Sequence, residues 1–582
     1  MDTQNNIEQV NTPQPTNIFT LAKSDTAFAI FALAASIFTA IFGILGGFAL
    51  GYLISLTLIL IIFTIYFAKS GKLSFFSVIS GLLALGNGAV FITTSNASVR
   101  FFAFVISFLL TLTYLGSLAL GNKKGNRQTV GIFYSAISTM GNIGASLKSL
   151  FASRGNNKKT FGKALLGLAC ALPVLIIVIP LLIASDDAFK GLMNSIFSNT
   201  FSTFVKANVG VVLAMFVIAY GFSLKFGKVS KIGKAKFKGM ENVYIISFLS
   251  SISVFYLLYL FSQLAYFFSA FKGFLPEGKI TYAEYARKGF FEMCAIAAIN
   301  LFIVFIALLL AKKQKHGLSL GVKALATFIS LFTLIIIATA ISKMVLYIGE
   351  YGMTVKRLTT SAFMLFLAIV FISLAIKVYL KKINVIKTAL VSAGVIVMLL
   401  GVLNVNTICA EYNYQAYVNK KLDDMHISTL YVLGDEGVPY LVKFAYAKDD
   451  VLAEQAQEYL STIYREEYFD NMENEANFTV EDLKKNEKNT SFSRFSIPKQ
   501  KAYNALYGFL EKNPTFDEIC MDYYNGSLEF PPNTYEITTD DYDLYSDESD
   551  FRSDEPDFYS EQSDFHSDVS DFHSDYPSDS QA

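Results

Sequence analysis

The sequence predicts an all-α integral membrane protein that crosses the bilayer about eleven times, followed by a small helical domain and an acidic tail. Three observations predict this class. Eleven apolar stretches, each long enough to cross a hydrocarbon core of about 30 Å, lie between residues 26 and 406. Basic residues collect in alternate gaps between these stretches. Only 16% of the 582 residues are charged, whereas soluble domains carry roughly 25%.

Each apolar stretch approaches the roughly 20 residues that a helix needs to cross a bilayer. We expect membrane spans at residues 26–45, 48–68, 73–92, 99–120, 164–184, 207–223, 243–270, 290–310, 324–346, 361–379 and 388–406.

The first two spans form a nearly continuous apolar run, 26–68. One very long tilted helix would invert the orientation of every later loop and place the basic loops outside. We favour two spans, because the glycines near the middle of the run permit a tight reversal. These glycines are Gly43, Gly46, Gly47 and Gly51.

Charge in the loops predicts the orientation. The gaps at 69–72, 121–163, 224–240 and 311–323 contain bases without any acid, and so does the stretch 377–387 from the end of the tenth span to the eleventh. The alternate gaps are sparser in bases or mixed with acids. The positive-inside rule places the basic gaps in the cytoplasm. We therefore expect a protein of the cell membrane whose polar residues 1–25 are cytoplasmic and whose carboxyl terminus is extracellular.

Two gaps show helical periodicity. Apolar residues recur at three- and four-residue steps in 129–153, beside several bases, as in an amphipathic helix on the inner leaflet or a helix packed beneath the bundle. Residues 187–205 predict a similar helix on the outer surface.

Charged residues near the outer ends of the spans form the candidate site. Such residues are costly in a membrane and are often functional. In a functional interpretation, these charged residues line an outward-facing polar cavity. In the alternative interpretation, the charged side chains extend to the membrane interface. The deeper amides of Asn87, Gln263 and Asn300 then form hydrogen bonds between helices. The candidates are Asp186, Asp187, Glu284, Arg287, Glu292, Lys343, Glu350 and Arg357.

Catalytic and cofactor motifs are missing from the sequence. We find no dinucleotide fingerprint, phosphate-binding loop, HExxH or GxSxG motif, so no catalytic residue, metal or cofactor is predicted. We expect the bilayer as the principal partner and no nucleic acid.

The composition changes after the last span. Residues 407–535 predict a small, mostly helical extracytoplasmic domain, with helices at 449–468 and 497–512 and Ser496 as a cap.

Residues 536–582 contain a seven-residue repeat with Asp at 543, 550, 557, 564 and 571. Only one apolar position in each repeat is regular, so disorder is favoured over a coiled coil. This tail either binds cations, a cell-wall polymer or a basic protein by multiple weak contacts, or only solvates the chain.

Several outer-face segments are similar to those of one family. They are 180–189, 282–292, 351–357, 430–441 and 492–506. Together they resemble a family of bacterial multi-pass membrane proteins, common in Gram-positive bacteria and catalogued only as a domain of unknown function. The resemblance covers roughly residues 26–510. It implies a fold and a location, but no substrate or catalytic residue.

Two functions fit these patterns. The first is a transport or flippase-like role through an outward-facing polar cavity. The second is an envelope-facing sensor or scaffold whose outer domain and tail bind partners. A membrane transferase is a weaker third, since outer-face carboxylates are few.

Overall fold

A computed structural model describes residues 21–68, 74–120, 139, 143–147, 149–150, 187–226, 239–272, 290–312, 318–380, 383–422, 425–472, 492–513 and 516. The described part of the chain is helical and contains no strand. The chain divides into two compact units, Met1–Lys512 and Asn513–Ala582. The acidic tail lies outside the described residues, and the predicted division at residue 407 stays a prediction.

Ten helices of the described chain are long and apolar enough to span a membrane, and they confirm the predicted class of polytopic all-α membrane protein. Each overlaps one predicted span, and the predicted fifth span, 164–184, lies outside the described residues. The ten helices are α1 (Lys23–Phe38) with the π-helical turn η1 (Thr39–Ile44), α2 (Leu50–Phe67), α3 (Phe75–Thr93), α4 (Ala97–Leu120), α7 (Asp187–Lys225), α8 (Asn242–Lys272), α10 (Phe290–Leu310), α11 (Leu320–Tyr351), α12 (Val355–Tyr379) and α13 (Val385–Val402).

The apolar run 26–68 does fold as two helices joined by a tight turn. Gly47 adopts φ +113°, a conformation that side chains other than glycine rarely permit. Gly51 lies so close to η1 that a Cβ atom there would stand 1.9 Å from the carbonyl oxygen of Phe42. The glycines therefore form the reversal that the sequence predicts.

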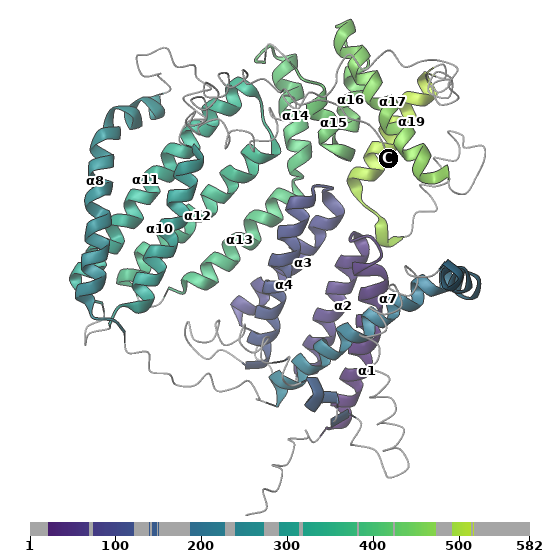
Figure 1. Cartoon of the computed structure of the whole chain (residues 1–582), viewed down its shortest axis with the longest axis horizontal. Coiled ribbons are helices and arrows are strands. Elements are labelled where there is room, and N and C mark those ends of the chain that lie inside the picture. The colour runs from purple at the N-terminus through teal and green to yellow at the C-terminus, as the bar shows by residue number, and fades with distance from the viewer. Residues whose placement is uncertain are drawn as a thin grey trace, which may run out of the picture. The chain divides into compact units, whose positions relative to one another are not determined.

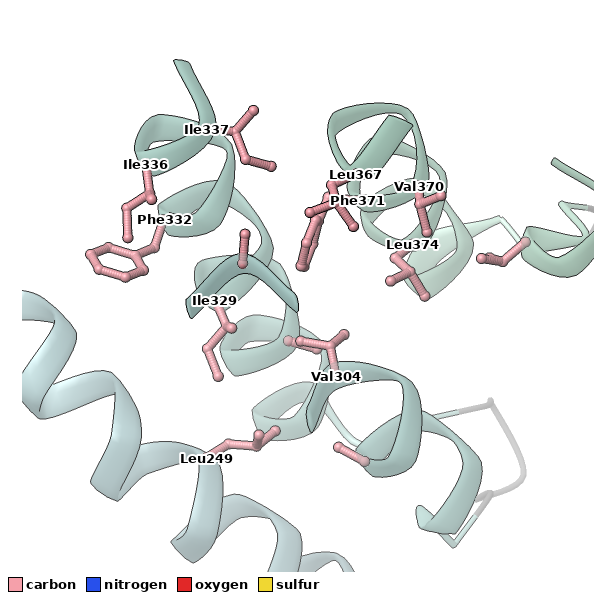
Figure 2. Packing of buried hydrophobic residues seen from close by; sticks show 14 of the residues in the cluster. Leu249, Val304, Ile329, Phe332, Ile336, Ile337, Leu367, Val370, Phe371 and Leu374 are labelled. Atoms are coloured by element: carbon pink, nitrogen blue, oxygen red, sulfur yellow. The ribbon is translucent and has the colours of Figure 1, made fainter. Parts of the chain in front are cut away.

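Two large hydrophobic cores hold most of the described spans together, and a smaller one joins α3, α4 and α13. The first bundle consists of α1–α4 and α7, and the second of α8 and α10–α12. In the second, Ile329, Phe332 and Ile336 of α11 pack among side chains of α8, α10 and α12 (Figure 2). Helix α13 packs against α3 and α4 on one side and against α12 on the other, so it connects the two bundles (Figure 1).

Short helices after the last span form what we call the carboxyl-terminal layer, residues 405–512. Figure 1 shows it beyond the ends of α3 and α13. Its elements are α14 (Val405–Val418), α15 (Ser428–Val432), the 3₁₀ turn η2 (Gly434–Glu436), α16 (Val438–Phe444), α17 (Asp450–Met472), the 3₁₀ turn η3 (Phe492–Arg494) and α19 (Ile497–Lys512). Helices α17 and α19 match the predicted 449–468 and 497–512 closely.

One predicted boundary differs. The surface helix expected at 187–205 and the span expected at 207–223 form a single helix, α7. A 39-residue helix extends about 58 Å, nearly twice the hydrocarbon thickness. The amphipathic helix expected at 129–153 lies mostly outside the described residues, which show helix at 143–147.

Candidate functional site

A buried carboxylate lies where the carboxyl-terminal layer meets the spans. Glu436, at the end of η2, is only 4% exposed. One oxygen accepts hydrogen bonds from the backbone N–H of Ser95 (2.7 Å), the hydroxyl of Thr94 (3.2 Å) and the side-chain amide of Asn404 (3.0 Å). The other accepts from the Ser95 hydroxyl and the side-chain amide of Asn406 (3.3 Å). These hydrogen bonds replace the ones that the carboxylate would form with water, and so reduce the free-energy cost of burying it.

The donors come from two turns that hold each other in place. Thr94, Ser95 and Asn96 form the turn from α3 to α4, where the Asn96 side chain caps α4 by accepting from Val99 N–H (3.0 Å). Asn96 also donates its amide to Asn406 (2.9 Å). Asn404, which separates α13 from α14, adopts φ +60°, a value that asparagine tolerates better than most residues. The two turns thus form a preorganised site for one carboxylate.

Arg100 provides positive charge near the site. Its guanidinium donates to the carbonyl oxygens of Thr94 (2.6 Å) and Phe91 (3.2 Å), at the end of α3. It also interacts electrostatically with Glu436 and Asp435. The arginine therefore stabilises both the carbonyl end of α3 and the charge brought by the layer.

Glycines allow η2 to approach the turn. Gly434 adopts φ +65°. A Cβ atom at Gly437 would stand 1.8 Å from the carbonyl oxygen of Leu430. The Gly-Asp-Glu-Gly segment therefore needs both glycines to present Glu436.

A second contact joins the layer to the other bundle. Asn413 of α14 accepts a hydrogen bond from Met353 N–H (2.7 Å) and donates to the Met353 carbonyl oxygen (2.9 Å) in the turn between α11 and α12. Its side chain is buried. The layer is thus hydrogen-bonded to span turns of both bundles.

Helix α14 carries two groups with shifted pKa values. Hydrogen bonds from Gln415 and Tyr440, and the nearby Lys443, hold the pKa of Glu411 below its ordinary value. Burial raises the pKa of the Cys409 thiol to about 12, although the charge of Arg357 opposes part of this rise. Cys409 is therefore a protonated, unreactive thiol at neutral pH.

The comparison with family models gives one match. The model of DUF4153, a domain of unknown function, matches residues 56–444. The chain belongs to this family. Neither the curated proteins nor the solved structures give a match. The matched region includes Glu436, Arg100 and every donor to the carboxylate, so the whole site lies within the DUF4153 domain.

The DUF4153 domain places the predicted site residues in different surroundings. Glu292 and Lys343 interact electrostatically between α10 and α11, with Tyr259 of α8 also close to Glu292. Glu350 is exposed near the end of α11. Asp187 begins α7, but its side chain is not described. Asp186, Glu284 and Arg287 lie outside the described residues.

Arg357 contacts its own turn. Its Nη1 donates to the carbonyl oxygens of Gly352 (2.7 Å) and Tyr351 (3.1 Å), and its guanidinium lies 4.0 Å from the ring centroid of Tyr347. These contacts cap the carboxyl end of α11 and stabilise the turn that Asn413 holds.

An uncharged polar chain crosses the second bundle of the DUF4153 domain. Tyr256 donates to the Asn300 side-chain oxygen (2.5 Å), and the Asn300 amide donates to the Thr333 hydroxyl (2.9 Å). Thr333 in turn donates to the Ile329 carbonyl oxygen (2.7 Å). Such hydrogen bonds between α8, α10 and α11 pair polar groups that would have no hydrogen-bond partner in the lipid hydrocarbon.

The first bundle has a charged pair with a buried carboxylate on the side away from the layer. The carboxylate of Asp25 in α1, 1% exposed, accepts from Lys225 of α7 and from the hydroxyl of Tyr66 (2.9 Å). Asp25 also accepts from Ala22 N–H (2.8 Å) and so caps its own helix. The pair holds together the ends of three spans.

Sequence reasoning missed Glu436 as a site residue. It occurs in the segment 430–441, which was singled out for its resemblance to the family. Three of its five hydrogen bonds, however, come from Thr94 and Ser95, more than 300 residues away, and the other two come from Asn404 and Asn406. The available signal was a pair of acids, Asp435 and Glu436, between two glycines in an otherwise apolar segment.

Proposed function

We propose that this multi-pass membrane protein is an envelope-facing sensor or scaffold. In this proposal the carboxyl-terminal layer binds a partner outside the cell, and the Glu436 site transmits that binding to the spans. The five hydrogen bonds on Glu436 support it most directly, because three of them tie the layer to the turn between α3 and α4 and a fourth, from Asn404, ties it to the turn between α13 and α14.

The attachment to both bundles supports this role. Glu436 holds the first bundle, while Asn413 holds the α11–α12 turn of the second. A partner that shifts the layer would change the relative position of these turns. Coupling of this kind needs two states that the partner binds with different affinity.

Crosslinking in cells tests the proposal. A photoreactive phenylalanine analogue replaces Val432 or Val451, both exposed in the layer, and replaces the lipid-facing Phe102 as a control. We expect discrete adducts from the layer positions and not from Phe102. Glu436→Gln should reduce adduct yield several-fold, because one acceptor oxygen becomes a donor facing other donors.

Glu454→Gln is the matched control, since it makes the same change on an exposed side chain of α17. Adducts that are equally abundant with Glu436→Gln and Glu454→Gln, or an absence of layer adducts, would contradict the proposal.

A second candidate is a transport or flippase-like role. The interaction of Glu292, exposed in the first turn of α10, with Lys343, half-buried in α11, favours it, because charge within a span is often part of a transport path. If lipid movement is the activity, proteoliposomes should expose fluorescent inner-leaflet lipids to a membrane-impermeant quencher. Lys343→Met should then abolish that exposure, whereas Lys356→Met, at an exposed position, should not.

A further inference from the structure

The turn η3 rests against the hairpin between the first two spans. The Ser493 hydroxyl donates to the Gly46 carbonyl oxygen (3.1 Å), and the ring of Phe492 lies 5.2 Å from that of Phe42. Arg494 packs over Gly47, where an added Cβ atom would stand 2.8 Å from its Cγ. The segment is therefore fixed at the depth where the first span ends.

Apolar side chains of this segment are exposed at that depth. Phe492 is 47% exposed, Phe495 42% and Ile497 39%. Leu45, at the end of the first span, is also exposed, so the apolar surface of the span continues onto the segment. Tryptophan favours the interface between hydrocarbon and headgroups, and this chain contains none. Phenylalanine and leucine also form the apolar face of segments that lie at the interface.

Basic side chains accompany these apolar groups. Arg494 and Lys501 are exposed, and Lys499 is half-buried. The first acid after Phe492 is Glu511. Apolar groups beside exposed bases match the boundary of a bilayer with anionic headgroups, where each base near the surface contributes about 1 kcal/mol.

We propose that residues 492–501 are an interfacial anchor. Phe495 and Ile497 insert into the lipid leaflet on the side of the carboxyl-terminal layer, and Arg494 and Lys501 bind the phosphates of anionic lipids. The anchor holds the layer against the membrane independently of the Glu436 site.

The absence of tryptophan permits a direct test. Phe495→Trp in the full chain provides a single tryptophan, which is excited selectively over the 32 tyrosines at long wavelength, and lipid nanodiscs with bromine at different acyl-chain depths report its position. Phe102→Trp in α4 is the lipid-exposed control, and Val451→Trp in α17 is the layer control. Ile497→Trp is a second reporter if Phe495→Trp does not fold.

We expect Phe495→Trp to be quenched by the shallowest bromines to at least half the extent seen for Phe102→Trp, with little quenching of Val451→Trp. A fluorophore at position 495 that bromines leave unquenched and aqueous acrylamide quenches as at 451 would overturn the anchor. A partner protein would then be the occupant of this surface.

The basic residues are tested in the same reporter. Raising the fraction of anionic lipid should increase quenching of Phe495→Trp, and adding Arg494→Gln with Lys501→Gln should remove this increase. Lys421→Gln with Lys448→Gln makes the same charge change at exposed positions elsewhere in the layer and should retain it. Loss of the increase in both double variants, or in neither, would overturn phosphate binding by Arg494 and Lys501.

Discussion

At the scale of single residues, polar side chains in this protein are satisfied by partners far away in sequence. Glu436 meets donors on the turn of Thr94 and Ser95, and Asn300 connects Tyr256 with Thr333. A sequence shows which polar residues occur within apolar segments. It does not show which distant turn provides the partner, because that depends on how the helices pack.

The thiol of Cys409 gives a residue-scale prediction. Its pKa of about 12 means that little thiolate exists at pH 7–9 in the folded protein. In a variant with the other three cysteines replaced by serine, a maleimide dye at pH 7.5 should label Cys409 only as the protein unfolds on heating. Val432→Cys in a cysteine-free background is the exposed control and should label at once.

The same raised pKa also predicts the direction of a pH effect on stability. The unfolded chain loses the thiol proton near its ordinary pKa, so stability from the buried thiol is complete below that value and is lost as pH rises toward 12. Rapid dye labelling of the folded protein at pH 7.5 would contradict both statements.

Glu411 provides a prediction at acidic pH. Its lowered pKa contributes stability above its ordinary value, and this contribution is lost as pH falls through the lower folded value. Tyr440→Phe removes one hydrogen bond (2.8 Å) from the partly exposed carboxylate of Glu411. It should therefore lower the free energy of unfolding at pH 6 by about 1 kcal/mol, and the melting temperature slightly.

The difference between wild type and Tyr440→Phe should shrink as the pH approaches 3. Tyr412→Phe makes the same change next to Glu411 on α14, at a partly exposed position, and should match wild type throughout. A difference that grows toward low pH would show that Glu411 is not the group involved.

At the scale of elements, the sequence predicts span positions well and continuity poorly. Hydrophobic length determines a span, so ten predicted spans coincide with described helices. Helix α7 was divided wrongly at about residue 206, because the change from amphipathic to apolar character does not interrupt a helix. Only a breaker such as proline or a capping residue does so reliably.

Two glycines of the layer give a matched prediction for its elements. Gly437→Ala should destabilise the layer by roughly 1–3 kcal/mol, because its Cβ would overlap the Leu430 carbonyl oxygen and displace η2. Gly508→Ala in α19 meets no atom within 4 Å and should stabilise by about 0.5–1 kcal/mol, since alanine favours helix. Hydrogen exchange of the layer measures both changes. Equal protection in the two variants would show that the close approach at Gly437 is not needed.

At the scale of the whole molecule, contacts between the described helices determine which ends share a membrane side. Asp25 pairs with Lys225, so α7 runs antiparallel to α1 and ends on the side away from the layer. Helix α4 starts beside Glu436 and ends on that same far side, at Leu120. Residue 205 of α7 lies on the layer side. We therefore predict an odd number of membrane crossings between residues 120 and 205. The single span predicted at 164–184 meets this condition.

Cysteine labelling tests the orientation. Ser230, between α7 and α8, follows a helix end on the far side, and Ser428 begins α15 in the layer. In intact cells an impermeant thiol reagent should label Ser428→Cys and not Ser230→Cys, because loops rich in lysine stay in the cytoplasm. Labelling of both positions, or of Ser230→Cys alone, would contradict the proposed orientation.

The pairing of Asp25 with Lys225 has a consequence for biosynthesis. The two residues are 200 positions apart, so at about 5–20 residues per second the ribosome needs roughly 10–40 s to produce Lys225 after Asp25. During this time the carboxylate at the start of α1 has no lysine partner and cannot be buried at low cost. The first helix to be made should therefore remain at the insertion machinery until the sixth predicted span arrives, and Lys225→Met should lengthen its stay there.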